Sequence, residues 1–241
     1  SRFTKTQLPV DFYHDWLGVA DDEARHFLML SDRLADLDAT YGDLPAHDGL
    51  WQAADATKHD LLARLAIAPL VLEARGLDVT PTMIDRLKSV GDEETANALG
   101  IIMTDEITHV SVGKRWFDYM CGMDRLDPVS TWHSLVKRYF HGDLKPPFNI
   151  AARNATHFSA AFYGPLATRD DFVASPEKMA RRLALIANTR GKAGLDEIIK
   201  IAVKNALRIS LFNIGPQILY HLIRMQNIRP DLVSPANIGF A

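Results

Sequence analysis

The chain has 241 residues, of which 47% are hydrophobic, and its formal net charge is -3. These values are typical of a globular protein with a sizeable core, and they argue against a protein that binds nucleic acid through its overall charge. There is no apolar run of about 18 residues, so no membrane helix is expected. The single cysteine, Cys121, excludes a disulfide within the chain and fits a reducing compartment, such as the cytoplasm or the mitochondrial matrix.

The first predicted helix covers residues 9–39, and Pro9 suits its first turn. Two polar residues, Glu23 and His26, lie within its apolar stripe. A buried carboxylate is unfavourable unless it is paired or binds a metal ion, so this placement is informative. The apolar members of the stripe follow steps of three and four and are Phe12, Trp16, Val19, Phe27 and Leu30.

A second long helix is predicted for residues 50–75. Pro69 should kink it, because proline cannot donate the helical hydrogen bond. Glu73 lies in the apolar run near the end of this helix. The helix is expected to stop at Gly76, and a separate short helix is expected over residues 80–90.

The third long helix is predicted for residues 92–121 and begins with acidic residues, which suit a helix N-terminus. Glu106 and His109 lie among its apolar positions. Two shorter helices are predicted for residues 128–140 and 150–163.

The composition changes near Thr168. We expect residues 1–167 to form a helical bundle domain and residues 168–241 to form a basic helical appendage. Its helices are expected at about 176–189 and 195–226, with an apolar face that docks on the bundle or on another chain. No stretch alternates as a strand would, so the predicted fold class is all-α.

The pattern D-E-x-x-H occurs twice, at residues 22–26 and 105–109. Residues three apart share one face of a helix, so the Glu and the His of each motif can point at one spot. In carboxylate four-helix bundles, two such helices and one Glu from each remaining helix hold two metal ions. The alternative interpretation is two unrelated pairs of a surface Glu and a core His.

Five stretches resemble the DUF455 family of bacterial ferritin-like proteins, over roughly residues 8–160. They are LPVDFYHDWLGVADDEARHF, YGDLPAHDGLW, HDLLARLAIAPLVLEARGLDVTP, DEITHVSVGKRWF and KPPFNIAAR. The resemblance implies a ferritin-like four-helix bundle related to di-iron carboxylate proteins. It also implies a distant similarity to the tRNA-modifying hydroxylase MiaE.

Ligands in such bundles follow the order Glu, Glu-x-x-His, Glu, Glu-x-x-His. The helix that carries the first Glu would then precede residue 1. We expect a preceding segment, a partner chain or the C-terminal region to fill its place. A homo-oligomer is one way to supply such a partner chain.

The predicted metal site has Glu23 and Glu106 as bridging or chelating carboxylates and Glu73 as a terminal carboxylate. His26 and His109 would supply one imidazole to each ion. Oxygen and imidazole ligands with open positions suit two iron ions, with manganese as a substitute. Two further acids precede a histidine by four residues and are candidates to accept the other ring N–H of a metal-bound histidine; they are Asp22 and Asp105.

This site predicts an oxidoreductase that activates O2 and hydroxylates or desaturates an organic substrate, either a small molecule or a modified nucleoside. The rival hypothesis is a non-catalytic scaffold subunit with a vestigial metal site. Such a subunit would use its basic C-terminal helices to bind a protein or RNA partner.

Overall fold

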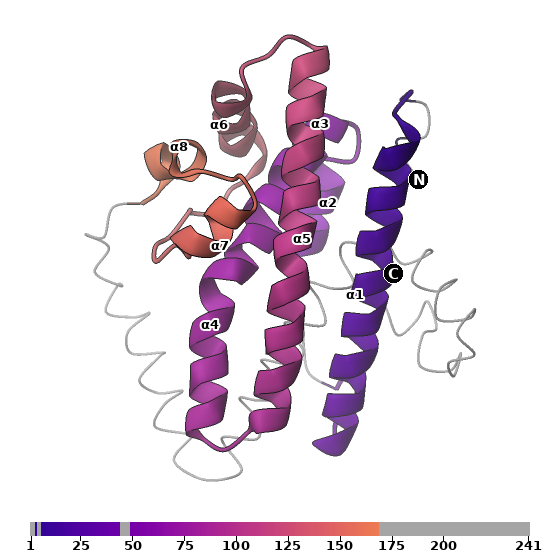
Figure 1. The fold of residues 1–241 in the computed structure, drawn as a ribbon, viewed down its shortest axis with the longest axis vertical. Coiled ribbons are helices and arrows are strands. Elements are labelled where there is room, and N and C mark those ends of the chain that lie inside the picture. The colour runs from indigo at the N-terminus through magenta and orange to yellow at the C-terminus, as the bar shows by residue number, and fades with distance from the viewer. Residues whose placement is uncertain (1–2, 4–5, 44–48, 169–241) are drawn as a thin grey trace.

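The computed structural model describes residue 3 and residues 6–43 and 49–168 (Figure 1). The regular elements of this part are helices, which confirms the all-α prediction. The long ones are α1 (Val10–Asp36), α4 (Ala74–Ser89) and α5 (Glu93–Met123). None of the described helices combines the length and the apolar character needed to cross a membrane. The helices predicted at about 176–189 and 195–226 lie outside the described residues.

Helix α5 is the centre of the described fold. Both α1 and α4 pack against it, and Figure 1 shows both running in the opposite direction to α5. Asp92 caps the N-terminus of α5, since its side chain accepts a hydrogen bond from the backbone N–H of Thr95 at 3.0 Å. The antiparallel pairing of α1 with α5 brings the two D-E-x-x-H motifs opposite each other.

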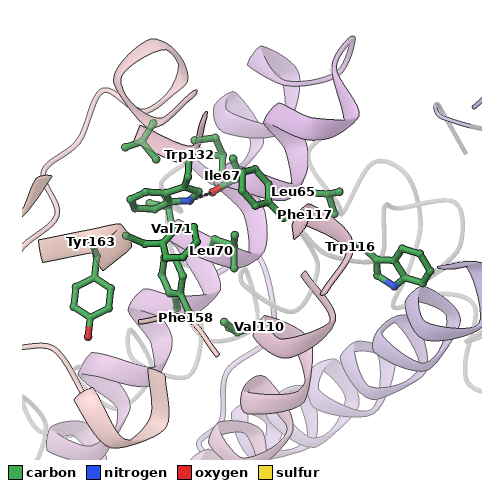
Figure 2. Packing of buried hydrophobic residues seen from close by; sticks show 14 of the residues in the cluster. Leu65, Ile67, Leu70, Val71, Val110, Trp116, Phe117, Trp132, Phe158 and Tyr163 are labelled. Carbon is green, nitrogen blue, oxygen red and sulfur yellow. Dashed lines mark hydrogen bonds between the residues drawn. The ribbon is translucent and has the colours of Figure 1, made fainter. Parts of the chain in front are cut away.

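Two hydrophobic clusters form the core. One joins the later part of α1 to α4 and to the first turns of α5, and it includes Leu30, Leu34 and Leu99. The other surrounds the last turns of α5 and is rich in aromatic residues, among them Phe117 and Trp132 (Figure 2). On α5, the change from one cluster to the other falls around Glu106 and His109.

The single helix predicted for residues 50–75 is wrong, because the chain turns after residue 56. Helix α2 (Gly49–Ala56) ends there, and α3 (Leu61–Ile67) begins with Asp60 as its N-cap. The Thr57 hydroxyl donates to the Ala53 carbonyl at 2.9 Å, and the Arg64 side chain also bonds in this turn. These side-chain hydrogen bonds stabilise the break.

In place of a simple kink at Pro69, the structure has a π-helical segment, η1 (Ala68–Glu73). Pro69 cannot donate a backbone hydrogen bond, and the wider turn accommodates this loss. Nearby, the indole N–H of Trp132 donates to the Ala66 carbonyl at 3.1 Å (Figure 2). Glu73 is the last residue of this segment and is buried.

The predicted stop at Gly76 is also wrong, as is the separate helix over residues 80–90. Helix α4 runs from Ala74 to Ser89 with Pro81 inside it. Pro81 has no N–H for the Leu77 carbonyl, which instead accepts a hydrogen bond from the Asn149 side chain at 3.1 Å. Because a distant residue satisfies this carbonyl, the helix continues through the proline.

Beyond α5, helix α6 (Pro128–Tyr139) agrees with the prediction for residues 128–140, apart from its last residue. The helix predicted for residues 150–163 is instead two short helices, α7 (Ile150–Ala155) and α8 (Ala160–Tyr163), followed by a 3-10 turn, η2 (Gly164–Leu166). The break lies at His157, whose φ of 57° is left-handed and incompatible with a continuing helix.

Candidate metal centre

Four side chains of the two motifs meet between α1 and α5. Glu23 and His26 come from α1, and Glu106 and His109 come from α5. All four are buried, with exposed fractions of 0–4%. In each motif, the three-residue spacing places the Glu and the His on the face that packs against the other helix.

The carboxylate of Glu23 lies between the two imidazoles. Its Oε1 is 3.1 Å from His109 Nδ1, and its Oε2 is 3.8 Å from His26 Nδ1. Glu106 Oε2 lies 3.7 Å from His109 Nδ1. Ligand atoms of Glu23, Glu106 and His109 all lie within 4.8 Å of one another.

These separations suit atoms that share a metal ion. Two donors bound at about 2.1 Å lie about 3.0 Å apart at a right angle and about 4.2 Å apart when opposite each other. The distances from His109 Nδ1 to the nearest oxygens of Glu23 and Glu106 fall within this range. One oxygen of Glu23 faces each imidazole, so this carboxylate connects the two histidines of the site.

The outer nitrogen of each imidazole is bonded to an aspartate of the other helix. His26 Nε2 lies 2.9 Å from Asp105 Oδ2, and His109 Nε2 lies 3.2 Å from Asp22 Oδ2. The four-residue spacing suggests a pairing within each helix, but the structure shows a crossed pairing. The crossing follows from the antiparallel packing of α1 and α5, which places each motif's aspartate beside the other motif's histidine.

The sequence reasoning missed Arg25, which lies inside the first motif. Its Nη2 donates to Asp22 Oδ1 at 2.7 Å and to Asp105 Oδ2 at 2.8 Å. The second motif has Thr108 at the equivalent position. The sequence does show that Arg25 lies close to the acidic pair Asp22 and Glu23. Its contact with Asp105 of the second motif depends on how the two helices pack.

Several inward-facing atoms of the site have no hydrogen-bond partner within the described residues. They are Nδ1 of His26, Nδ1 of His109 and both carboxylate oxygens of Glu106. Buried polar atoms are nearly always satisfied, and each exception calls for an explanation. Imidazole nitrogens and carboxylate oxygens that converge without partners fit a site for metal ions.

The protonation equilibria point to the same need for positive charge. Burial lowers the pKa of His109, but the carboxylates of Glu106 and Glu23 outweigh this effect and raise it to about 11. The pKa of His26 is also raised, since Glu23 outweighs burial. Burial raises the pKa of Glu106, whereas the two histidines hold the pKa of Glu23 below its usual value against the opposing effect of burial. Without metal, protons supply the positive charge of this cluster.

Glu73 contributes to the same electrostatic environment. It is 1% exposed, and its negative charge helps to raise the pKa of His109. Glu73 and His26 lie outside the group of three whose ligand atoms fall within 4.8 Å. Glu73, at the end of the π-helical segment η1, is thus buried near the site. The closest contacts of the site are made by residues of α1 and α5.

Comparisons with known proteins identify the family. The family model described as "Protein of unknown function (DUF455)" matches residues 1–164. A protein of Haemophilus influenzae described as "Uncharacterized protein" is 39% identical over 148 residues, which make up 61% of this chain and 51% of that protein. The chain thus spans about half the length of this curated relative. No solved structure matches the chain significantly. Since the family model covers more than half of the sequence, the chain belongs to the DUF455 family.

Proposed function

We propose that this chain is a ferritin-like di-iron carboxylate protein that acts as an oxidoreductase on an organic substrate. The observation that carries the proposal is the arrangement of the two imidazoles. Each outer Nε2 is bonded to an aspartate, while each inner Nδ1 faces the buried carboxylates and has no hydrogen-bond partner in the described part of the chain. A histidine that binds metal through one nitrogen usually donates from the other to a carboxylate.

Glu23, Glu106, His26 and His109 would hold the ions, and Glu73 would supply a further carboxylate. Oxygen and imidazole donors without thiolates favour iron, with manganese as a substitute. Bound iron would supply the redox chemistry with O2 that the side chains themselves lack. The protein residues would fix the donor atoms, balance the positive charge and exclude bulk water from the buried face.

Oxidation by hydroxylation or desaturation is the reaction class that we propose, with a small molecule or a modified nucleoside as substrate. The distant similarity to the tRNA-modifying hydroxylase MiaE, which is part of this proposal, supports a modified nucleoside as the substrate. The support from the structure is the pair of reciprocal D-E-x-x-H motifs on antiparallel helices, which is the arrangement that di-iron carboxylate bundles use.

The test is metal analysis of the purified full chain after anaerobic loading with ferrous iron. We expect about two iron ions per chain, followed by O2 consumption on exposure to air. Glu106→Ala and His109→Ala should each abolish tight binding of at least one ion. Glu93→Gln is the matched control, because Glu93 is an exposed acid on the same helix.

Wild-type protein that binds no more iron than the Glu106→Ala and His109→Ala variants would contradict the proposal. Metal-free protein that purifies with a protein or RNA partner would instead favour the scaffold hypothesis. Competition with zinc checks the metal preference. Protein loaded with iron should keep its iron while it consumes O2, and protein loaded with zinc should consume no O2.

A further inference from the structure

The exposed end of the metal centre carries a hydrogen-bonded chain that joins the two helices. It runs from His26 to Asp105, to Arg25, to Asp22 and to His109. We name the three outer residues, Asp22, Arg25 and Asp105, the clasp. We propose that Arg25 is a positioning residue that aims both metal-facing imidazoles through the two crossed Asp–His pairs. This inference rests on the proposed metal centre.

One nitrogen of Arg25 makes both contacts of the clasp. Its Nη2 donates to Asp22 and to Asp105, at 2.7 and 2.8 Å. Asp105 uses the same oxygen, Oδ2, for Arg25 and for His26, whereas Asp22 uses Oδ1 for Arg25 and Oδ2 for His109. A shift of the guanidinium therefore moves both carboxylates, and each carboxylate moves an imidazole on the other helix.

Electrostatics explains why a cation is needed at this position. The clasp brings two carboxylates to one nitrogen, and without a cation between them they would repel each other. The Asp22 and Asp105 side chains are 31% and 23% exposed, so both could rotate towards water. Arg25 offsets this repulsion and keeps the two acceptors directed at the buried rings.

The clasp also fixes which ring nitrogen faces the metal. A carboxylate that accepts from Nε2–H holds the proton on that nitrogen and leaves Nδ1 free to bind the ion. Because the pairs are crossed, each aspartate orients the histidine of the opposite helix. Asp22 therefore controls His109, and Asp105 controls His26, while Arg25 controls both.

The crossed wiring can be tested first without metal. In full-length protein with 15N-labelled histidine, NMR measures the exchange of each ring Nε2–H with water. Asp22→Ala should speed the exchange of His109 by about tenfold, the effect of losing one charge-assisted hydrogen bond, and should leave His26 unchanged. Asp105→Ala should do the reverse, and Arg25→Met should affect both rings.

The second measurement is a titration with Zn2+, a diamagnetic ion that lets both rings be followed as it binds. Asp22→Ala should weaken zinc binding at His109 by about 10–100-fold, and Asp105→Ala should do the same at His26. Arg25→Met should weaken binding at both positions. Arg25→Lys should restore most of the affinity and of the exchange protection, because a single nitrogen makes both contacts of the clasp.

The matched control is Arg115→Met. Arg115 also links α5 to α1, through Asp15 at 2.8 Å, and its side chain is about as exposed as that of Arg25. If Arg25 merely docked the two helices, the two arginine variants would behave alike, which would overturn the inference. An Asp22→Ala effect on His26 instead of His109 would overturn it as well.

The two proposals can fail separately. Wild-type protein that binds no metal ion but shows the crossed exchange pattern would refute the di-iron function and support the clasp. Protein that binds about two ions with exchange rates insensitive to Arg25→Met would support the metal centre and refute the clasp.

Discussion

Two clusters of buried charge in this protein differ in how their polar atoms are satisfied. In the first, Asp78 of α4 and Arg153 of α7 form a buried ion pair with contacts of 2.7 and 2.8 Å. Asp78 also accepts from the backbone N–H of Asn149 at 2.9 Å. The guanidinium lies over three aromatic rings, those of Phe148, Phe158 and Tyr163. In the second cluster, the candidate metal centre, the inner nitrogens of both histidines and the oxygens of Glu106 have no hydrogen-bond partner among the described residues.

The comparison distinguishes buried charged groups that are paired within the protein from buried groups that are arranged to bind a cation. A buried ion pair with complete hydrogen bonding contributes to the architecture, and removing one partner leaves an uncompensated charge. Buried donors that converge without partners are instead unfavourable until a cation arrives. The first cluster should therefore control stability, and the second should control metal binding.

The largest effect is expected from Arg153→Ala. It leaves the buried Asp78 carboxylate with only the partly exposed Arg75, 3.4 Å away, as a cation, and should lower the free energy of unfolding by about 3 kcal/mol. Urea denaturation of the metal-free protein measures this change. The exposed Arg138, which stacks on Tyr139, provides the control, since Arg138→Ala should stay within about 0.5 kcal/mol of wild type. Loss of metal binding by folded Arg153→Ala protein would break the proposed separation of roles.

The pH dependence of stability should reverse when metal binds. The pKa of His109 rises from 6.5 to about 11 on folding. Folded and unfolded metal-free protein both hold this proton below pH 6.5, and the stabilisation is lost as the pH rises from there to about 11. Each such proton contributes up to about 1.4 kcal/mol per pH unit. Bound metal displaces the Nδ1 proton, so loaded protein should instead become more stable as the pH rises.

Unfolding between about pH 6.5 and pH 9, with and without Zn2+, measures this reversal. His109→Gln should flatten the decline in the metal-free protein, because the amide does not titrate. Parallel curves with and without zinc would show that the imidazole is not a ligand.

A smaller effect is expected where α5 crosses the π-helical segment. A Cβ at Gly113 would collide with the ring of Pro69, so Gly113→Ala should destabilise the protein by about 1–3 kcal/mol. Gly100 lies on the same helix with no neighbour near its Cβ position. Gly100→Ala should therefore stabilise by up to about 1 kcal/mol, through helix propensity. Thermal unfolding of the two variants checks the opposite signs, and equal shifts would contradict the close contact.

The sequence allowed prediction of α1, of α5 and of the Glu and His residues buried between them, because all of these follow from local spacing. The apolar stripe and the three-residue step from Glu23 to His26 depend only on helical geometry. The continuation of α4 through Pro81 depends on Asn149, which lies far away in the sequence and supplies the missing donor. The crossed pairing and the reach of Arg25 depend in the same way on how α1 packs against α5, which no local pattern encodes.

The smallest expected effect comes from replacing a carboxylate by its amide in each cluster. Because the chemical change is the same, the two clusters can be compared directly. Replacing Asp78 by Asn removes a charge that Arg153 requires, so the free energy of unfolding of the metal-free protein should fall. Replacing Glu106 by Gln removes a carboxylate whose pKa burial raises, although the interaction with His109 opposes this effect.

Glu106→Gln should therefore raise the stability of the metal-free protein, by about 1 kcal/mol, since the burial of this carboxylate outweighs its attraction to His109. The gain should grow as the pH rises above the ordinary carboxyl value of 4.5, because the raised pKa of Glu106 makes the wild-type protein less stable there. The same variant should lose metal affinity. Denaturation of both amide variants at several pH values, with and without Zn2+, measures these changes. A loss of metal-free stability by Glu106→Gln as large as that of Asp78→Asn would show that the protein itself satisfies the Glu106 carboxylate. In that case the two clusters would be structural alike.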